Sequence, residues 1–239
     1  MIENAAREPE IIDLATFLNN MGAQIRGAGT DVIRITGVQT MQSMNTHTII
    51  ADRIETGTYL SLAAAMGDGV MINNVIPEHI EAYTSKMIDM GVDLQIGIDR
   101  IYVPTVHDLR PTIVKTMPYP GFATDLQQPL TPLMSRASGE SRVVDTIYPK
   151  RVKHIPELQK MGMDISAQDG SILVRQSQQL RGADVKAAEI RAGASLMIAG
   201  LMAEGTTTIH NADHILRGYD RIVWKLNRLN ADVAIEDED

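Results

Sequence analysis

Hydrophobic and polar positions repeat along this 239-residue chain with a period close to 70 residues. A five-residue phrase of apolar, Gly or Asn, apolar, polar and apolar residues recurs at Met21–Ile25, Met90–Leu94, Met161–Ile165 and Leu229–Val233. Apolar residues at helical spacing precede each phrase, and Gly or Asn at its second place suits a helix end in the left-handed conformation. The apolar alternation after the phrase predicts a strand.

A second set of shared positions lies fourteen residues before the phrases, at Arg7, Ile76, Ile147 and Ile215. A strand-like run precedes this position. The three later copies also have an upstream apolar helix, at Ile54–Met66, Leu126–Arg136 and Ile190–Ala203. The unit therefore reads helix, strand, turn, helix, strand, and one further strand. Three units follow a half-unit over residues 1 to about 40. This alternation predicts an α/β fold with mixed strand directions.

Duplication alone explains the apolar positions, so function is expected in the turns where the units differ. Arg151 and Arg217 lie in turns expected to lead from a strand into a helix, where a cation opposes the helix dipole. We interpret them as holding an anion together with helix N–H groups. Glu8 and Glu10 favour the dipole of the first helix, so a structural explanation is as good as a functional one.

Charged residues also mark the starts of the three upstream helices, at Arg53, Asp125, Glu189 and Arg191. Taken singly, each has a structural explanation: Asp125 is a suitable N-cap, and Glu189 and Arg191 suit a solvated surface. If the units pack by symmetry, however, these helix ends converge. Acids among arginines would then suit a base that acts on an anionic substrate.

Composition narrows the function classes. With 22 Lys and Arg against 30 Asp and Glu, the formal net charge is −8, which excludes nucleic-acid binding by bulk charge but allows a small anion. The absence of Cys excludes disulfides and Cys-based metal or nucleophilic sites within this chain. No stretch approaches the roughly 20 apolar residues of a membrane span. We expect a soluble, cytoplasmic chain that binds no membrane and no metal.

Five segments carry a resemblance to a known family: Glu3–Ile11, Asp52–Gly57, Pro118–Gln127, Arg191–Ala194 and Arg217–Tyr219. In their order and spacing they resemble the UDP-N-acetylglucosamine 1-carboxyvinyltransferases, a family of enolpyruvyl transferases. The match covers essentially the whole chain. The first, third and last segments are the most specific.

The resemblance implies a fold of repeated β/α units that form an inside-out three-fold barrel. It implies that residues 1–50 are the last part of a first domain. Residues 51–239 would form a second domain that lacks its N-terminal strand, so the chain would be truncated at its N-terminus. The implied reaction transfers the enolpyruvyl group of phosphoenolpyruvate to the 3′-hydroxyl of UDP-N-acetylglucosamine, with release of phosphate. This is the first committed step of peptidoglycan precursor synthesis, and it implies no cofactor or metal.

The resemblance also implies roles for individual residues. Asp125 matches the acid beside the accepting hydroxyl, a proposed general base, and Ile147 matches a position that contacts the nucleotide sugar. Arg151, Arg191 and Arg217 match arginines around phosphoenolpyruvate. The implied catalytic set is Asp125, Arg217, Arg191 and Glu8, and the remaining cleft residues are Arg53 and Glu189. Glu189 stands where the family pattern has Asp, which keeps the charge but lengthens the side chain.

Because half of the family's cleft would be absent, we expect the isolated chain to be inactive. We also expect an uncovered apolar face that promotes self-association. Two alternatives stay open. One is a half-length anion-binding protein or decayed paralogue without catalysis. The other is an enzyme of the same superfamily with a different acceptor, such as shikimate 3-phosphate.

Overall fold

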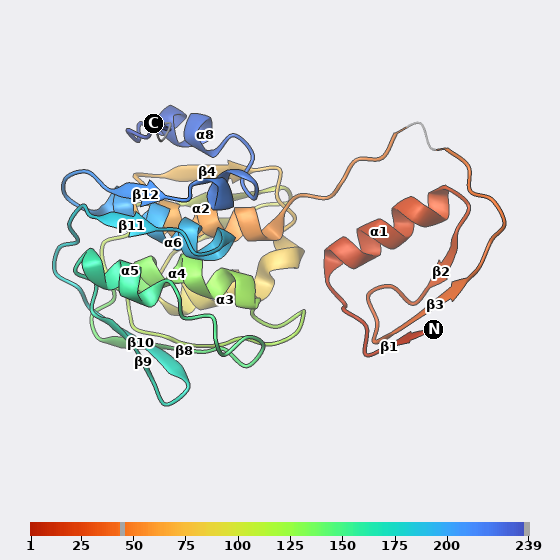
Figure 1. The fold of residues 1–239 in the computed structure, drawn as a ribbon, viewed down its shortest axis with the longest axis horizontal. Helices are drawn as coiled ribbons and strands as arrows, with labels where there is room; N and C mark the ends of the chain where they lie inside the picture. Colours follow the sequence, from red (N-terminus) through yellow and green to blue (C-terminus); the bar gives the residue numbers. More distant parts are fainter. Residues whose placement is uncertain (44–45, 237–239) are drawn as a thin grey trace.

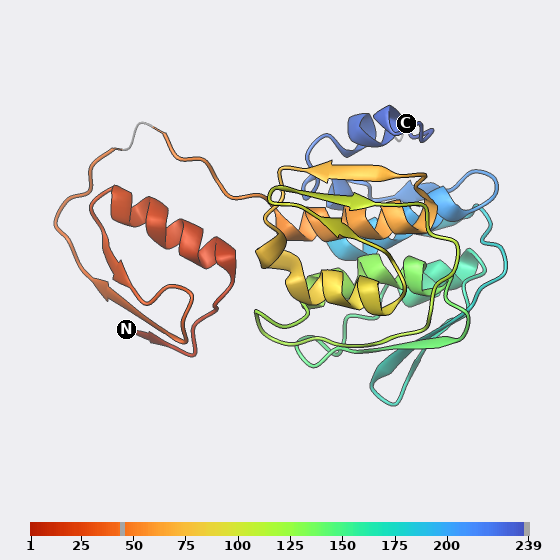
Figure 2. The ribbon, with the colours of Figure 1, turned by 180° about the vertical axis from the view of Figure 1, so that it is seen from behind.

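The computed structural model describes residues 1–43 and 46–236, which form two lobes of unequal size (Figure 1). We name residues 1–43 the small lobe and residues 52–236 the large lobe. An extended segment joins them, and α1 of the small lobe lies nearest the large lobe in both side views (Figure 2). The chain passes from one lobe to the other between residues 43 and 52.

The small lobe consists of one helix on a three-stranded antiparallel sheet. Its elements are β1 (Ile2–Glu3), α1 (Pro9–Asn20), β2 (Gln24–Arg26) and β3 (Val32–Thr36), and the strand order is β1-β3-β2. Pro9 is suited to the first turn of α1 because its missing N–H would be unpaired there. Ile12, Leu14 and Ile35 are all more than two-fifths exposed. The small lobe thus leaves apolar surface uncovered.

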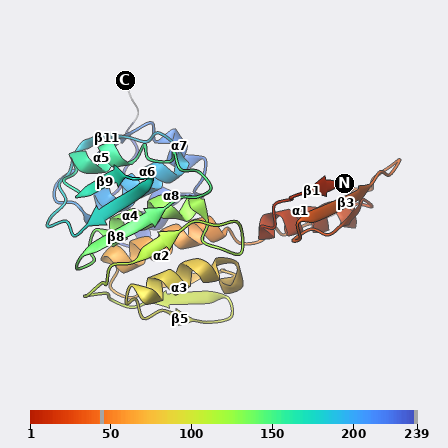
Figure 3. The same ribbon diagram turned by 90° about the horizontal axis from the view of Figure 1, so that it is seen from below.

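Three helices form the centre of the large lobe: α2 (Arg53–Met66), α4 (Gln127–Met134) and α6 (Ile190–Met202). They pack pairwise against one another, and the sheets lie outside them (Figure 3). Every residue of α4 is buried, as are most residues of α2 and α6. Helices that are covered on all sides need mostly apolar or small residues. The exceptions at the start of α4, Gln127 and Gln128, are buried with hydrogen bonds to Arg151 O and His154 Nδ1.

The outer sheets follow the repeat. The first contains β4 (Val70–Asn73), β5 (Gln95–Ile96) and β6 (Arg100–Val103) in the order β4-β6-β5. The second contains β7 (Ile113–Lys115), β8 (Glu140–Val144), β9 (Ile165–Gln168) and β10 (Ser171–Arg175) in the order β7-β8-β10-β9. The third pairs β11 (Asp184–Lys186) with β12 (Thr208–His210). Two pairs, β7 with β8 and β11 with β12, are parallel, and the others are antiparallel.

The shorter helices complete the units. They are η1 (Pro77–Ile80), α3 (Glu81–Asp89), η2 (Thr124–Leu126), α5 (Ile155–Lys160), α7 (Asp213–Leu216) and α8 (Ile222–Arg228). The predicted α/β class with mixed strand directions is confirmed, and so is the inside-out arrangement with helices at the centre. Within the described part of the chain, no helix is both long and apolar enough to cross a membrane.

The repeated phrase has the local structure that its pattern predicts. Its second residue has a positive φ in every copy: 99° at Gly22, 99° at Gly91, 87° at Gly162 and 64° at Asn230. A helix precedes each copy, and a strand follows the first three. The strand predicted after the fourth copy is wrong, because residues 231–236 form none. β2, β5 and β9 each pair with the strand that follows them in the chain.

One further expectation is wrong. Arg217 is expected in a turn that leads into a helix, but it caps the C-terminal end of α7, where a cation favours the helix dipole. Arg151 does lie in the turn between β8 and α5, as expected, and α5 itself begins at Ile155. Neither arginine belongs to a helical first turn.

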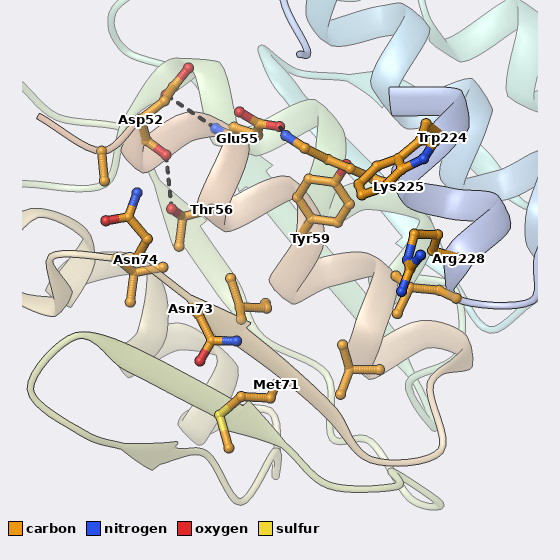
Figure 4. Close-up of a pocket in the computed structure, with 15 residues that line it drawn as sticks. Asp52, Glu55, Thr56, Tyr59, Met71, Asn73, Asn74, Trp224, Lys225 and Arg228 are labelled. Atoms are coloured by element: carbon orange, nitrogen blue, oxygen red, sulfur yellow. Dashed lines mark hydrogen bonds and ion pairs between the residues drawn. The ribbon is translucent and has the colours of Figure 1, made fainter. Parts of the chain in front are cut away.

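A groove of about 570 Å³ lies between α2, β4 and α8 (Figure 4). Tyr59, Trp224 and Lys225 line it, and the Lys225 Nζ lies 2.7 Å from Glu55 Oε1. The groove follows the edge of β4 that has no strand beside it among the described residues. None of the site residues predicted from the sequence lines this groove, although Ala51 and Asp52 line both the groove and the cleft described below.

Backbone contact at Gly182 gives a stability prediction. A Cβ at this position would lie 2.1 Å from the carbonyl oxygen of Thr206, and Gly182 N donates to Glu204 O at 2.7 Å. Gly182→Ala should therefore lower the free energy of unfolding by about 1–3 kcal/mol, as overpacked positions do. The measurement is urea denaturation. Arg181→Ala, which removes the neighbouring exposed side chain, should change the free energy of unfolding by less than about 0.5 kcal/mol. Equal midpoints for both variants would contradict the close contact.

Candidate functional site

The N-terminal ends of the three central helices converge on one cleft. Arg53 is the first residue of α2, Asp125 lies in η2 directly before α4, and Arg191 lies in the first turn of α6. All three line a cleft of about 750 Å³, which we name the inter-lobe cleft, together with residues of α1 and of the connecting segment. Helix N-termini carry partial positive charge and free N–H groups. The floor of the cleft is thus suited to an anion.

Asp125 is the centre of an ion-pair cluster in this cleft. Its Oδ1 lies 2.5 Å from Arg151 Nη1, and its Oδ2 lies 3.2 Å from Arg191 Nε. Glu189, the residue before α6, lies 3.5 Å from Arg151 Nε through its Oε1. The side chains of Arg53, Arg151 and Arg191 are 11 to 15% exposed, and Arg53 and Arg191 line the cleft itself. These charges are thus screened by water much less than surface pairs are.

The pKa of Asp125 lies below its ordinary value. Burial acts to raise the pKa, but the hydrogen bond from Arg151 and the charges of Arg191 and Arg151 outweigh it. Asp125 is therefore a carboxylate at neutral pH. It is a hydrogen-bond acceptor held between two guanidinium groups.

Arg191 is held from its other side by Tyr219. Arg191 Nη1 donates to the Tyr219 hydroxyl at 3.3 Å, and its guanidinium carbon lies 5.7 Å from the centre of the ring. That hydroxyl also lies 3.0 Å from Thr58 Oγ1 on α2. Sequence reasoning assigned no role to Tyr219, although it ends one of the segments that carried the resemblance.

One ion pair joins the two lobes across the cleft, and a further polar contact joins the connecting segment to α1. Arg53 donates twice to Glu10 of α1, from Nη2 to Oε1 at 3.0 Å and from Nε to Oε2 at 3.3 Å. His47 Nε2 lies 3.2 Å from Asp13 Oδ1. Burial acts to raise the pKa of Glu10, but the hydrogen bond and charge of Arg53 lower it overall. Sequence reasoning gave Glu10 only a helix-dipole role and so missed this contact.

The structure brings some of the predicted residues together and separates others. Asp125, Arg151, Arg191 and Glu189 form one cluster, and Arg53 lines the same cleft. Glu8 precedes α1, and no hydrogen bond or ion pair joins its side chain to these arginines within residues 1–43 and 46–236. Arg217 is exposed and makes no ion pair with another described residue.

Ile147 is 46% exposed, and its backbone N–H donates to Asp145 Oδ1 at 3.0 Å. The backbone of Ile147 is thus fixed while its side chain stays open to solvent. As for metals, the described residues contain no group of three or more His, Asp or Glu that could hold an ion.

Comparison with known proteins identifies the family. A family model described as EPSP synthase (3-phosphoshikimate 1-carboxyvinyltransferase) matches residues 1–226. The chain belongs to this enolpyruvyl transferase family. UDP-N-acetylglucosamine 1-carboxyvinyltransferase 2 of Lactiplantibacillus plantarum is 67% identical over 98% of the chain and 55% of its own length. UDP-N-acetylglucosamine 1-carboxyvinyltransferase of Lactobacillus acidophilus is 61% identical over 99% of the chain and 55% of its own length.

Solved structures show the same fold. The enolpyruvyl transferase NikO from Streptomyces tendae matches with a TM-score of 0.85 and 26% identity, over 96% of this chain and 55% of that one. EPSP synthase from Acinetobacter baumannii matches with a TM-score of 0.66 and 20% identity, over 90% and 53%, which supports the fold alone. The resemblance drawn from the sequence is confirmed. The chain spans about 55% of the length of these relatives.

The ion-pair cluster gives a titration prediction. Arg151→Leu removes a hydrogen-bond donor and a positive charge from Asp125 but leaves burial in place, so the pKa of Asp125 should rise. The measurement is the pH titration of the Asp125 carboxyl carbon by NMR. Arg142→Leu is the matched control, because Arg142 is an exposed arginine of β8 whose Nη2 lies 3.7 Å from Glu140 Oε1.

The shifted pKa of Asp125 also makes the stability of the fold depend on pH. The folded pKa of Asp125 lies below the ordinary value of 3.8, so its contribution to stability is present above pH 3.8 and is lost as the pH falls through the folded pKa. In Arg151→Leu this contribution should shrink. An unchanged Asp125 titration in that variant would contradict the cluster as described.

Proposed function

We propose that this protein takes part in transferring the enolpyruvyl group of phosphoenolpyruvate to the 3′-hydroxyl of UDP-N-acetylglucosamine, with release of phosphate. The observation that carries the proposal is the ionised Asp125 between Arg151 and Arg191 at the meeting point of three helix N-termini. The names of relatives with 61 to 67% identity support the choice of reaction. The product would enter peptidoglycan precursor synthesis.

The cluster has the parts that this chemistry needs. The acceptor hydroxyl loses a proton as its oxygen bonds to C2 of phosphoenolpyruvate, and C3 gains a proton. Loss of phosphate and of a C3 proton then restores the vinyl group. Asp125 would take the hydroxyl proton, a role typically worth about 10²–10⁴ in rate. The guanidinium groups would bind the carboxylate and phosphate of phosphoenolpyruvate and stabilise charge in the transition state.

The low pKa of Asp125 is compatible with a role as the general base. A carboxylate held by two cations is a weak proton acceptor, since the cations stabilise its charged form. Phosphoenolpyruvate would compete for the same guanidinium groups and partly withdraw their charge from Asp125. Its pKa would then rise toward the range in which proton transfer is efficient. Donor binding would thus prepare the base before the acceptor reacts.

We further propose that the two lobes belong to two domains, residues 1–50 and residues 51–239, and that the cleft lies between them. The division at the connecting segment and the 55% coverage of the relatives support this division. On this proposal the isolated 239-residue chain has little or no transferase activity, because it spans only 55% of the length of the relative from Lactiplantibacillus plantarum.

The remaining candidate acceptor is shikimate 3-phosphate, the substrate class named in the family description. The two UDP-N-acetylglucosamine 1-carboxyvinyltransferases compared above are 61 to 67% identical to this chain, against 20% for the Acinetobacter EPSP synthase. The higher sequence identity therefore favours UDP-N-acetylglucosamine as the acceptor. An anion-binding protein without catalysis would share the arginine cluster and differ only in lacking turnover.

Donor binding can be tested on this chain directly. Phosphoenolpyruvate should bind with millimolar or weaker affinity and shift the NMR signals of Arg151, Arg191 and Asp125. Arg191→Leu should weaken binding by about tenfold or more, as losing a hydrogen bond between two charged groups does. Arg142→Leu should leave it unchanged. Equal binding by wild type and Arg191→Leu would contradict the assigned site.

Acceptor choice and turnover form a separate test. With phosphoenolpyruvate bound, UDP-N-acetylglucosamine should shift the signals of Asp125 and Ile147, and shikimate 3-phosphate should not. Phosphate release from phosphoenolpyruvate and UDP-N-acetylglucosamine by the 239-residue chain should stay at background. Clear release by this chain would contradict its inactivity, and selective binding of shikimate 3-phosphate would contradict the proposed acceptor.

A further inference from the structure

A buried carboxylate that sequence reasoning did not single out lies beside the cluster. Asp145 follows β8 and is 7% exposed. Its Oδ1 accepts hydrogen bonds from Thr116 Oγ1 at 2.7 Å, Ile147 N at 3.0 Å and Tyr148 N at 2.8 Å. Its Oδ2 accepts one from Thr124 Oγ1 at 2.6 Å. The carboxylate thus has four donors.

These donors are all neutral, and no cation pairs with Asp145 among the described residues. A buried carboxylate is costly unless it is fully hydrogen-bonded. Burial acts to raise its pKa, but the bonds from Thr124, the Tyr148 N–H and Thr116 outweigh burial and lower it. The charge is therefore kept by an arrangement of donors that must stay in place.

The donors come from three separate segments of the chain. Thr116 lies just after β7, Thr124 lies in η2 next to Asp125, and Ile147 and Tyr148 lie in the turn that leads to Arg151. One carboxylate therefore joins the segments that carry the two partners of the Asp125–Arg151 ion pair.

The link to the ion pair is direct on both sides. Arg151 Nη1 donates to Thr124 Oγ1 at 3.3 Å as well as to Asp125 Oδ1 at 2.5 Å. The Arg151 guanidinium carbon also lies 5.4 Å from the ring centre of Tyr148, whose N–H is held by Asp145. Asp145 thus acts on Arg151 through Thr124 and through Tyr148.

We propose that Asp145 is a positioning residue, which fixes the Asp125 carboxylate and the Arg151 guanidinium relative to each other through Thr124 and the 147–148 backbone. This inference rests on the proposed function for what the ion pair does, but the geometry is independent of it. A role in stability alone would make a different prediction. Loss of the Thr124 hydroxyl would then weaken the fold and leave the titration of Asp125 unchanged.

Two single substitutions separate these roles. Asp145→Asn removes the charge with little change in shape. Thr124→Val removes only the hydroxyl that joins Asp145 to Arg151, and it is nearly isosteric. Asp164→Asn is the matched control, since Asp164 is an exposed carboxylate whose Oδ1 lies 3.5 Å from Arg175 Nη1. The readouts are the Asp125 titration by NMR and phosphoenolpyruvate binding, each on variants whose thermal melts and amide spectra show a folded chain.

In Thr124→Val, which leaves the local charge unchanged, the Asp125 titration should move to higher pH because Arg151 is held less firmly beside it. Phosphoenolpyruvate binding should weaken by about tenfold in Thr124→Val, the effect of one hydrogen bond to a charged group, and it should also weaken in Asp145→Asn although a negative charge is lost nearby. The double variant should bind no more weakly than the more severe single variant, because the Thr124 hydroxyl acts by joining Asp145 to Arg151. Asp164→Asn should match wild type in both readouts.

An Asp125 titration that stays at the wild-type position in folded Thr124→Val would overturn the inference. Because Thr124→Val leaves the local charge unchanged, it decides the question even if Asp145→Asn fails to fold. The two proposals also fail separately. If wild type does not bind phosphoenolpyruvate, the proposed function fails, while the Asp125 titration still tests the positioning role.

Discussion

The close parallel packing of α2, α4 and α6 is the constraint on which the rest of the molecule depends. Glycines let neighbouring segments approach these helices: a Cβ at Gly57 of α2 would lie 2.5 Å from Leu126 Cδ2 of η2, and one at Gly193 of α6 would lie 2.5 Å from Ile215 Cγ1 of α7. Since the three helices start on the same side, their positive ends meet. Asp52 offsets part of this charge by accepting from the N–H groups of Ile54 and Glu55, and Asp125 adds a second carboxylate there.

The charge of the cleft is local and opposite in sign to that of the chain. The formal net charge is −8, yet Arg53, Arg151 and Arg191 lie within one region of low exposure. Each is paired with an acid, and the partner of Arg53 is Glu10 of the small lobe. The contact between the lobes and the floor of the cleft therefore share a cation. A substrate anion that binds Arg53 acts on both.

Groups outside the ion-pair cluster hold its geometry. Tyr219 links Arg191 to Thr58 of α2, and Asp145 links Thr124 to the turn before α5. Two long guanidinium side chains would otherwise lose considerable rotamer freedom on pairing with Asp125. Fixing them beforehand leaves more of their interaction energy for the substrate. The polar residues around the cluster are thus as much part of the site as its charges.

The sequence by itself determined the repeat, the left-handed residues that end the helices, and the three helix starts at which Arg53, Asp125 and Arg191 stand. These features depend on local periodicity and on the conformational freedom of glycine and asparagine, so they can be read over short windows. Only the tertiary structure decided that Glu10 rather than Glu8 meets Arg53, that Arg217 ends a helix, that residues 231–236 form no strand, and that Asp145 supports Asp125. Each of these depends on a partner distant in the chain or on strand pairing, and side-chain type and spacing do not encode which partners meet.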